Sequence, residues 1–211
     1  MEELDRCIEG GAVLIKWARN SQIFDPSDRK YKWFYKKLAD ENLPLLCHTG
    51  LEHAIPLEKT DYLEFGDSRK LRLALNLGVK VIAAHSATSY SPLEKTYLDE
   101  LSEMFDEGER RGWYLYADIS AMCTLFRASI IEEVFEKIPL NRMVLGIDYP
   151  IPVDNMRPKF VETLTLKEYL EIAKVDNPIE KNYRQVLAMD FSGGAMTNAS
   201  SILQIPEERF L

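Results

Sequence analysis

Residues 43–50 read LPLLCHTG, a short apolar run that ends in a histidine, a threonine and a glycine. Residues 80–87 repeat this arrangement as KVIAAHSA. Near-continuous apolar runs of this length are typical of strands that are covered on both faces, as in parallel sheets. Three further runs have the same character: residues 11–17 (GAVLIKW), 113–120 (WYLYADIS) and 143–150 (MVLGIDYP). The sequence therefore predicts five buried strands.

The segments between these runs carry apolar residues at helical spacing and end at Gly, Asn or Pro. Helices are expected at residues 28–41, 68–77 and 93–112, and after Ser129, which with Glu132 forms a capping box. Thr165 with Glu168, and Asn177 before Pro178, begin two more. Strict alternation of strands and helices predicts an α/β fold with a parallel sheet. No linker-like segment interrupts it, so we expect one domain over residues 1–211.

Composition restricts the possible partners and the compartment. The chain has 211 residues, 46% of them hydrophobic, and a net charge of −8. An acidic surface repels phosphate backbones, so no nucleic-acid partner is expected. The three cysteines form no CxxC pair, which favours a reducing compartment. The N-terminal residues lack an apolar signal-peptide core, and no run reaches membrane-spanning length, so a cytoplasmic protein is expected.

Groups capable of metal binding stand where three of the predicted strands end. Parallel α/β folds bind ligands at the carboxyl ends of their strands. His48, His85 and Asp148 occupy these positions in the second, third and fifth runs. Two imidazoles and a carboxylate suit Zn²⁺ or a similar divalent ion, which would acidify water and polarise a carbonyl group. Asp148 and His85 are the candidates for proton transfer, although each of the three could also be a structural residue.

Three other residues are candidates for substrate binding, and one is a candidate for a structural role. Lys16 lies near the end of the first run, and Glu52 and His53 follow His48 on a loop. A rim salt bridge for Lys16 and solvated loop positions for the other two are the alternatives. Asp118 in the fourth run is expected to hold loops together and to take no part in chemistry.

The chain resembles the amidohydrolase superfamily, in the branch of metal-dependent hydrolases and aromatic-acid decarboxylases. The resemblance rests on IKW (15–17), LPLLCHTG (43–50), VIAAHS (81–86), YADIS (116–120), LGIDYP (145–150) and the tail segments NPIEKNY and TNASSIL. It implies a (β/α)₈ TIM barrel, of which this chain would form part: about five parallel strands and the C-terminal helices. It also implies one divalent metal ion, zinc with manganese as the alternative. His48 would match the fifth-strand ligand, His85 the sixth-strand histidine, and Asp148 the eighth-strand ligand and proton shuttle.

The chain departs from this family in two places. Ser86 and Ala87 follow His85 where the family often has Cys-Gly or Gly-Gly, and no His-x-His pair is present. The strands that open such a barrel are therefore expected to be missing, which would weaken or abolish metal binding. Two open sheet edges would result, and a homo-oligomer that covers them is expected. The alternatives are a fragment of a longer enzyme and an open, doubly wound sheet; a flavodoxin-like phosphate site lacks its glycine-rich loop.

The predicted function is metal-dependent hydrolysis of a C–O or C–N bond in a small carboxylated or cyclic substrate, or decarboxylation on the same scaffold. The alternative is a catalytically inactive barrel piece that serves as a binding or assembly module.

Overall fold

One parallel sheet lies at the centre of the protein. The computed structural model describes residues 2–51, 64–90, 93–124, 127–151, 165–188, 194–203 and 205. Within them, the strands are β1 (Ile15–Trp17), β2 (Leu45–His48), β3 (Val81–Ala84), β4 (Leu115–Asp118) and β5 (Met143–Val144). Each neighbouring pair is parallel. The five predicted strands are confirmed, each inside the run that predicted it.

The strands lie side by side in the order in which they occur in the chain, β1-β2-β3-β4-β5. A doubly wound sheet reverses its direction of winding at a switch point, and this sheet does not. The open, doubly wound alternative is therefore wrong. Sequential order is the arrangement of barrel strands, and the carboxyl ends of all five strands meet at one rim.

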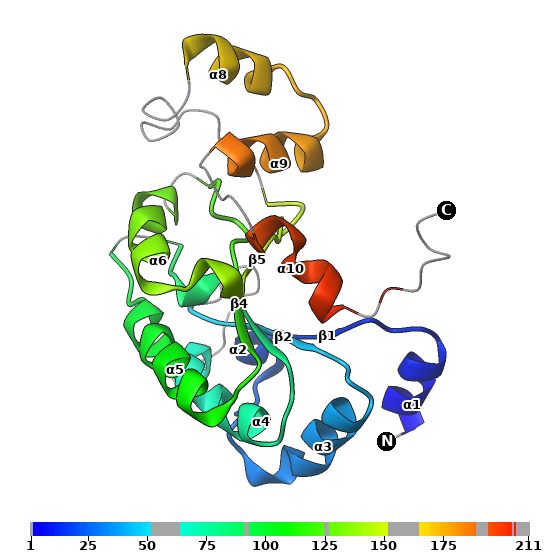
Figure 1. Cartoon of the computed structure of the whole chain (residues 1–211). Helices are drawn as coiled ribbons and strands as arrows, with labels where there is room; N and C mark the ends of the chain where they lie inside the picture. The colour runs from blue at the N-terminus through cyan, green and yellow to red at the C-terminus, as the bar shows by residue number, and fades with distance from the viewer. Residues whose placement is uncertain are drawn as a thin grey trace.

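Helices surround the sheet on several sides (Figure 1). They are α1 (Glu2–Glu9), α2 (Arg19–Gln22), α3 (Lys32–Asp40), α4 (Arg72–Asn76), α5 (Leu98–Arg111), α6 (Ile131–Lys137), α8 (Leu166–Ala173), α9 (Pro178–Ala188) and α10 (Gly194–Ile202). Short 3₁₀ segments lie at η1 (Arg29–Tyr31), η3 (Ser68–Leu71), η4 (His85–Ala87), η5 (Arg127–Ile130) and η6 (Leu140–Arg142).

Two of the predicted helix starts are confirmed. Thr165 and Glu168 form a complete capping box at the start of α8. Asn177 accepts the backbone N–H groups of Ile179 and Glu180 at the start of α9, which begins at Pro178 as predicted. These starts depend on local hydrogen bonds alone, and that is why the sequence reveals them.

Two other helix predictions are wrong in detail. The N-cap residue of α6 is Ile130 and not Ser129, because η5 runs directly into the helix. The helix expected from residue 93 begins at Leu98, whose N–H donates to the Thr96 hydroxyl. Leu93 lies outside the helix and is 95% exposed, so it is not part of the apolar stripe of α5.

The main core lies between the sheet and helices α3 to α6. Leu45 and Cys47 of β2 are buried on this face. Their partners from the helices include Leu38, Leu101 and Val134. This packing explains the near-continuous apolarity of the strands, because their other face is covered as well.

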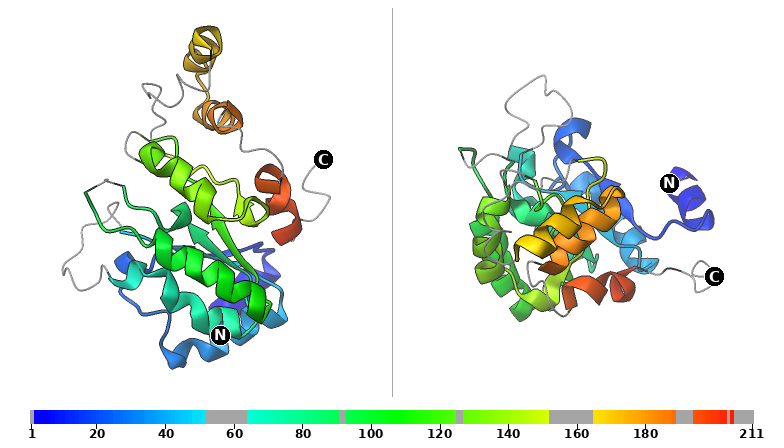
Figure 2. Two further views of the ribbon diagram at one scale, coloured as in Figure 1. Left: turned by 60° about the vertical axis from the view of Figure 1, so that its left-hand side comes forward. Right: turned by 90° about the horizontal axis from the view of Figure 1, so that it is seen from above.

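The opposite face of the sheet carries a smaller cluster that includes the C-terminal helix. Leu46, Ile82 and Tyr116 stand next to one another in register across β2, β3 and β4. Ile82 and Val144 pack with Ile202 of α10, which is 1% exposed. Helix α10 therefore covers part of this inner face, and Figure 2 shows it on the other side of the sheet from α5.

Helix α10 also bonds to the backbone around β5. The Asn198 side-chain amide donates to the carbonyl groups of Met143 (2.8 Å) and Asn141 (3.0 Å). The Leu145 N–H donates to the Ala195 carbonyl at 2.9 Å. Helix α10 therefore covers part of the β5 edge, which the sequence led us to expect open.

Candidate functional site

The candidate residues stand at one rim because each follows the carboxyl end of a strand. His48 is the last residue of β2, and His85 directly follows β3. Asp118 is the last residue of β4, and Asp148 comes four residues after β5. His48 and Asp118 lie two residues beyond Leu46 and Tyr116 and so point to the same inner face, above its apolar cluster.

The structure brings His48, His85 and Asp148 together. The Nε2 atom of His85 lies 3.8 Å from Oδ2 of Asp148. The rings of His48 and His85 meet edge to face, with their centroids 4.9 Å apart. Both histidines are buried, and the Asp148 side chain is 36% exposed. Solvent or a small ligand can therefore reach the cluster from the Asp148 side.

The cluster is not a closed metal site. Among the residues that the structure describes, no three His, Cys, Asp or Glu side chains are arranged to hold a metal ion. His48 Nε2 lies 3.3 Å from the Leu51 carbonyl oxygen. That oxygen can only accept a hydrogen bond, so His48 donates to it. The contact between His85 Nε2 and Asp148 Oδ2, at 3.8 Å, comes near the spacing of two ligands on one ion, about 3.0–3.5 Å for bonds of the usual length.

Asp118 and Ser120 surround the far side of His85. The Asp118 carboxylate accepts the backbone N–H of His85 at 2.6 Å and that of Ser120 at 3.1 Å. The Ser120 hydroxyl oxygen lies 2.6 Å from the same carboxylate oxygen and 2.8 Å from Nδ1 of His85. The prediction that Asp118 holds loops together is confirmed. Nothing in the sequence singled out Ser120, since its role depends on a residue 35 positions away.

His85 begins a left-handed turn. His85, Ser86 and Ala87 have φ values of 60°, 49° and 57°, and none of them is glycine. Such backbone costs about 1–2 kcal/mol per residue. Ser86 Oγ donates to the Asp118 carbonyl at 2.8 Å, and the Thr88 N–H donates to the His85 carbonyl at 2.9 Å. These bonds hold the turn, which directs the His85 ring toward Asp148, whose own φ is 60°.

Positive charge and burial act together on His85. Burial is the largest cause that lowers the pKa of His85 well below its usual value, followed by electrostatic interactions with Arg127, the neighbouring His48 ring and Lys16. Arg127 follows β4 and is only 5% exposed. The sequence did not single out Arg127. A buried arginine after a strand end is a signal only once its burial is known.

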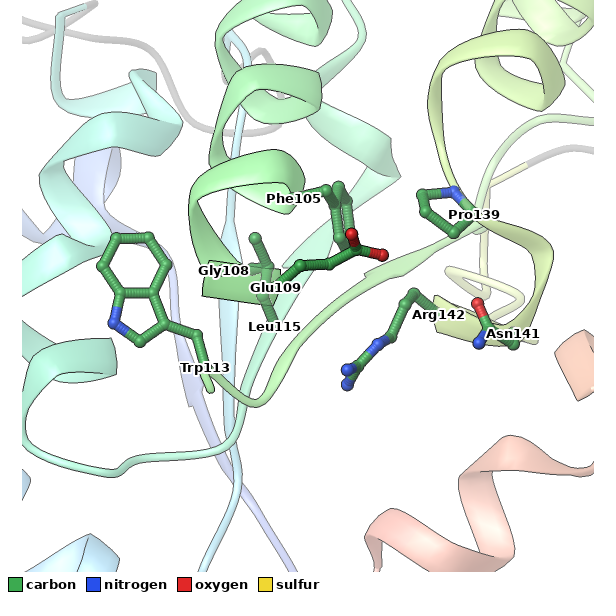
Figure 3. A pocket seen from close by; sticks show the side chains of 8 residues that line it. All are labelled: Phe105, Gly108, Glu109, Trp113, Leu115, Pro139, Asn141 and Arg142. Atoms are coloured by element: carbon green, nitrogen blue, oxygen red, sulfur yellow. The ribbon is translucent and has the colours of Figure 1, made fainter. Parts of the chain in front are cut away.

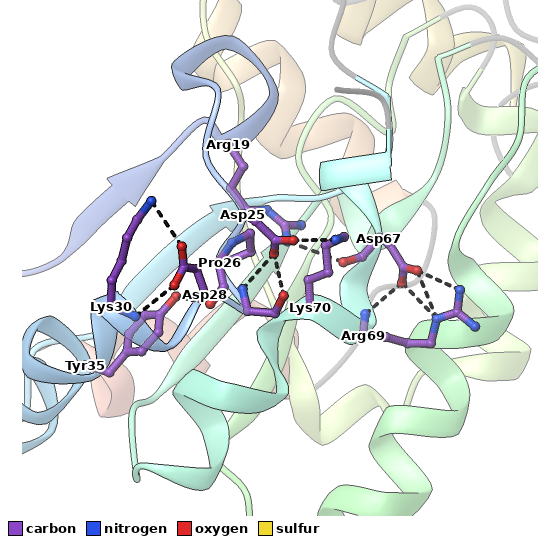
Figure 4. Close-up of polar contacts among 10 residues, drawn as sticks. Arg19, Asp25, Pro26, Asp28, Lys30, Tyr35, Asp67, Arg69 and Lys70 are labelled. Carbon is purple, nitrogen blue, oxygen red and sulfur yellow. Dashed lines mark hydrogen bonds and ion pairs between the residues drawn. The ribbon is translucent and has the colours of Figure 1, made fainter. Parts of the chain in front are cut away.

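Arg19 holds the carboxyl end of β2 in place. Its side chain is completely buried, and its Nε and Nη2 atoms donate to the His48 carbonyl at 3.0 and 2.8 Å. Its Nη1 atom donates to the Asp67 carbonyl at 3.3 Å (Figure 4). Asp67 is fastened in turn by its ion pair with Arg69. Arg19 therefore connects the backbone of a candidate ligand with the segment before α4, and no sequence motif revealed it.

The remaining predicted residues are less informative. Lys16 is exposed and stands beside Leu46 in the sheet register, one step below His48 on the inner face. Its positive charge acts on His85, and its role in substrate binding stays a prediction. Glu52 and His53 lie outside the described residues.

A small pocket lies at the opposite rim of the sheet. It has a volume of about 60 Å³ and is lined by Phe105, Gly108, Glu109, Trp113, Leu115, Pro139, Asn141 and Arg142 (Figure 3). Leu115 begins β4, and Arg142 directly precedes β5, so the pocket lies at the amino ends of the strands. It has room for about two water molecules and is remote from the histidines. It is therefore not the candidate site.

Comparison with solved structures agrees with the barrel-like order of strands and helices described above. An uncharacterized TIM-barrel protein from Bordetella bronchiseptica is similar over 88% of this chain and 62% of its own, with 19% identity and a TM-score of 0.50. The chain has the fold of a partial TIM barrel. A Pseudomonas putida protein, named provisionally as a 2-pyrone-4,6-dicarboxylic acid hydrolase, matches over 91% of this chain and 68% of its own, with 10% identity and a TM-score of 0.51.

These similarities concern the fold. The partial TIM barrel spans 62% of the length of the Bordetella protein. A Staphylococcus aureus protein, provisionally named an amidohydrolase, has a TM-score of 0.48, with 14% identity over 97% of this chain and 68% of its own. No protein-family model and no curated protein matches the chain.

In the described part of the partial barrel, no helix is both long and apolar enough to cross a membrane.

Proposed function

We propose that this chain is a metal-dependent hydrolase of the amidohydrolase type, acting on a C–O or C–N bond of a small carboxylated or cyclic substrate. Decarboxylation of such a substrate is the related reaction on the same scaffold. One observation carries the proposal: His48, His85 and Asp148, from the ends of three different strands, meet at one rim, with 3.8 Å between His85 Nε2 and Asp148 Oδ2.

The donor set fits a divalent ion in its chemistry. Two imidazoles and one carboxylate are a common ligand set for zinc, and manganese also accepts it. The His85–Asp148 distance exceeds ligand spacing by only a few tenths of an ångström. A bound ion of this kind supplies Lewis acidity, which polarises a carbonyl oxygen and makes water a stronger acid.

Asp148 is the group best placed to move protons. It is the most exposed of the three side chains, so water and substrate can reach it. In hydrolysis it would accept a proton as water attacks the substrate carbon, and would return that proton to the leaving oxygen or nitrogen as the C–O or C–N bond breaks. In decarboxylation the C–C bond breaks, CO₂ leaves, and the carbon takes up a proton from Asp148.

The charges around the site favour an anionic substrate. Arg127 and Lys16 both act on His85 as positive charges. Burial of Arg127 increases the strength of its field, because the surroundings screen it poorly. These two cations attract a substrate carboxylate and act against the negative charges of Asp118 and Asp148 beside His85, which supports a carboxylated compound.

A second function has an observation in its favour. No three-ligand cluster exists among the described residues. This is what we expect of a catalytically inactive barrel that serves as a binding or assembly module. The two proposals differ in metal content, which is directly measurable.

The test is metal content after saturation with Zn²⁺ or Mn²⁺ and removal of the excess, measured by mass spectrometry. The hydrolase predicts close to one ion per chain, lost in His48→Ala, His85→Ala and Asp148→Asn. Asp106→Asn, at an exposed position of α5, is the matched control and should retain the ion. Absence of metal from the unaltered protein at saturation would refute the hydrolase and favour the binding module.

A further inference from the structure

We infer that Ser120 and Asp118 are positioning residues that hold the ring proton of His85 on Nδ1 and so turn the lone pair of Nε2 toward Asp148. The inference concerns which nitrogen carries the proton in the neutral ring. That choice decides whether His85 can act as a ligand or proton acceptor toward Asp148, since only an unprotonated nitrogen can do either.

The direction of each hydrogen bond follows from the partners. Asp118 Oδ1 accepts two backbone N–H groups, from His85 and Ser120, so it acts as an acceptor. The Ser120 hydroxyl, 2.6 Å away, therefore donates its single proton to Asp118. It has no proton left for His85 Nδ1 at 2.8 Å and must accept one from that nitrogen.

A second contact gives the same answer independently. The Ser120 backbone carbonyl oxygen lies 3.3 Å from His85 Nδ1. A carbonyl oxygen has no proton to donate, so Nδ1 is the donor in this contact too. Both oxygens of Ser120 thus require the proton on Nδ1, which leaves Nε2 unprotonated in the neutral ring and 3.8 Å from Asp148.

The backbone of Gly146 packs closely against Ser120 and Asp118, the two residues that contact the His85 ring and its backbone. A Cβ atom at Gly146 would lie 2.9 Å from Ser120 Cβ and 3.3 Å from Asp118 Cγ. Gly146 comes two residues before Asp148. The segment that carries Asp148 therefore packs directly on the two residues that orient His85, so the two halves of the site are built against each other.

The value of this arrangement for catalysis rests on the proposed function. Histidine ligands commonly donate their second nitrogen to a carboxylate or carbonyl group, which sets the tautomer and the ring direction. Here a serine stands between the carboxylate and the ring. Loss of such a partner lowers metal affinity about 10–100-fold.

The test is the tautomer of His85 in the metal-free, ¹⁵N-labelled full-length chain, read from long-range ¹H–¹⁵N correlations of the histidine rings at neutral pH. The variant His85→Gln identifies the signals. We expect the Nδ1–H form in the unaltered protein and a shift of about fivefold or more toward Nε2–H in Ser120→Ala, as expected for a lost hydrogen bond. Ser120→Cys, which preserves the shape, should show the same direction.

Ser102→Ala is the matched control, because the Ser102 hydroxyl bonds the Lys137 carbonyl away from the site. Asp118→Asn should change the His85 tautomer in a protein that is otherwise unaltered. It should have no further effect in a protein that already carries Ser120→Ala. An Nε2–H ring in the unaltered protein overturns the inference. An unchanged tautomer in Ser120→Ala and Ser120→Cys overturns the role of the hydroxyl and Asp118.

The two proposals fail separately. A protein with Nδ1–H that binds no metal refutes the proposed function and leaves the inference standing. A protein that binds zinc with the Nε2–H tautomer in its metal-free state refutes the inference alone. Where zinc binds, Ser120→Ala should weaken its affinity about 10–100-fold while Ser102→Ala leaves it unchanged.

Discussion

The substitution Gly50→Ala should separate the two turns that carry the candidate histidines. Gly50 follows His48 by two residues and has a φ of +83°. A Cβ atom there would lie 2.5 Å from the carbonyl oxygen of Thr88, which belongs to the turn after His85. The two turns can approach each other this closely only because residue 50 has no side chain.

The loss of stability has two parts. Placing alanine in left-handed backbone costs about 1–2 kcal/mol. The overlap with the Thr88 carbonyl forces the backbone to shift, at a further cost of about 1–3 kcal/mol. Gly112→Ala isolates the first part, because Gly112 has a φ of +68° and nothing within 4 Å of an added Cβ. Gly50→Ala should therefore lose about 1–3 kcal/mol more than Gly112→Ala.

Urea denaturation of the unaltered protein and both variants measures this difference, provided that the three share one dependence on denaturant. Equal losses in the two variants would refute the reasoning, because the steric contact between the turns would then have no energetic weight. A larger loss in Gly112→Ala would refute it more strongly.

Three further predictions concern other parts of the structure. Asn198→Ala should lower the free energy of unfolding by about 1–3 kcal/mol, because the Met143 and Asn141 carbonyl groups lose their donor. Thermal denaturation measures this loss, with Ser200→Ala on the same helix as the control. A loss no greater than that in the control would contradict the prediction. Arg19→Met should lower the free energy of unfolding by about 2–4 kcal/mol, since two buried hydrogen bonds to the His48 carbonyl and one partly buried hydrogen bond to the Asp67 carbonyl are lost; an unchanged denaturation curve would count against it. In metal-free protein, the lowered pKa of His85 means that below pH about 6.5 the unfolded chain binds a proton that the folded chain does not. The free energy of unfolding is unaffected by His85 above that pH and should fall by about 1.4 kcal/mol per pH unit below it. Denaturation of His85→Asn at a series of pH values should not show this slope. A slope that persists in His85→Asn would assign the pH dependence to other groups.

Several features followed from local sequence. The five strands, their parallel pairing and the starts of α8 and α9 were all predicted, because apolar runs and capping residues act over a few positions. The rim positions of His48, His85 and Asp148 also followed, since a residue at the end of a parallel strand has only one rim available. The prediction that Asp118 holds the loops together belongs with these.

Other features depended on contacts between distant segments. The interior position of α10 required Ile202 to meet Ile82 and Val144, which no local pattern encodes. The β5 edge, which was expected to be open, is partly covered for the same reason, because Asn198 of α10 bonds the backbone there from 55 residues away.

For this protein, the sequence alone determined which strands form, that they run parallel, and at which end of three of them a metal-capable side chain stands, because these follow from local periodicity and the geometry of parallel sheets. The tertiary structure decided the order of the strands in the sheet. Only the tertiary structure decided how those side chains are aimed. Three features depend on burial and on hydrogen bonds between remote residues: the left-handed turn at His85, the hydrogen bonds from Arg19 to the His48 carbonyl, and the contacts of Ser120 and Asp118 with His85. Such bonds gain their strength only once folding has excluded water from them.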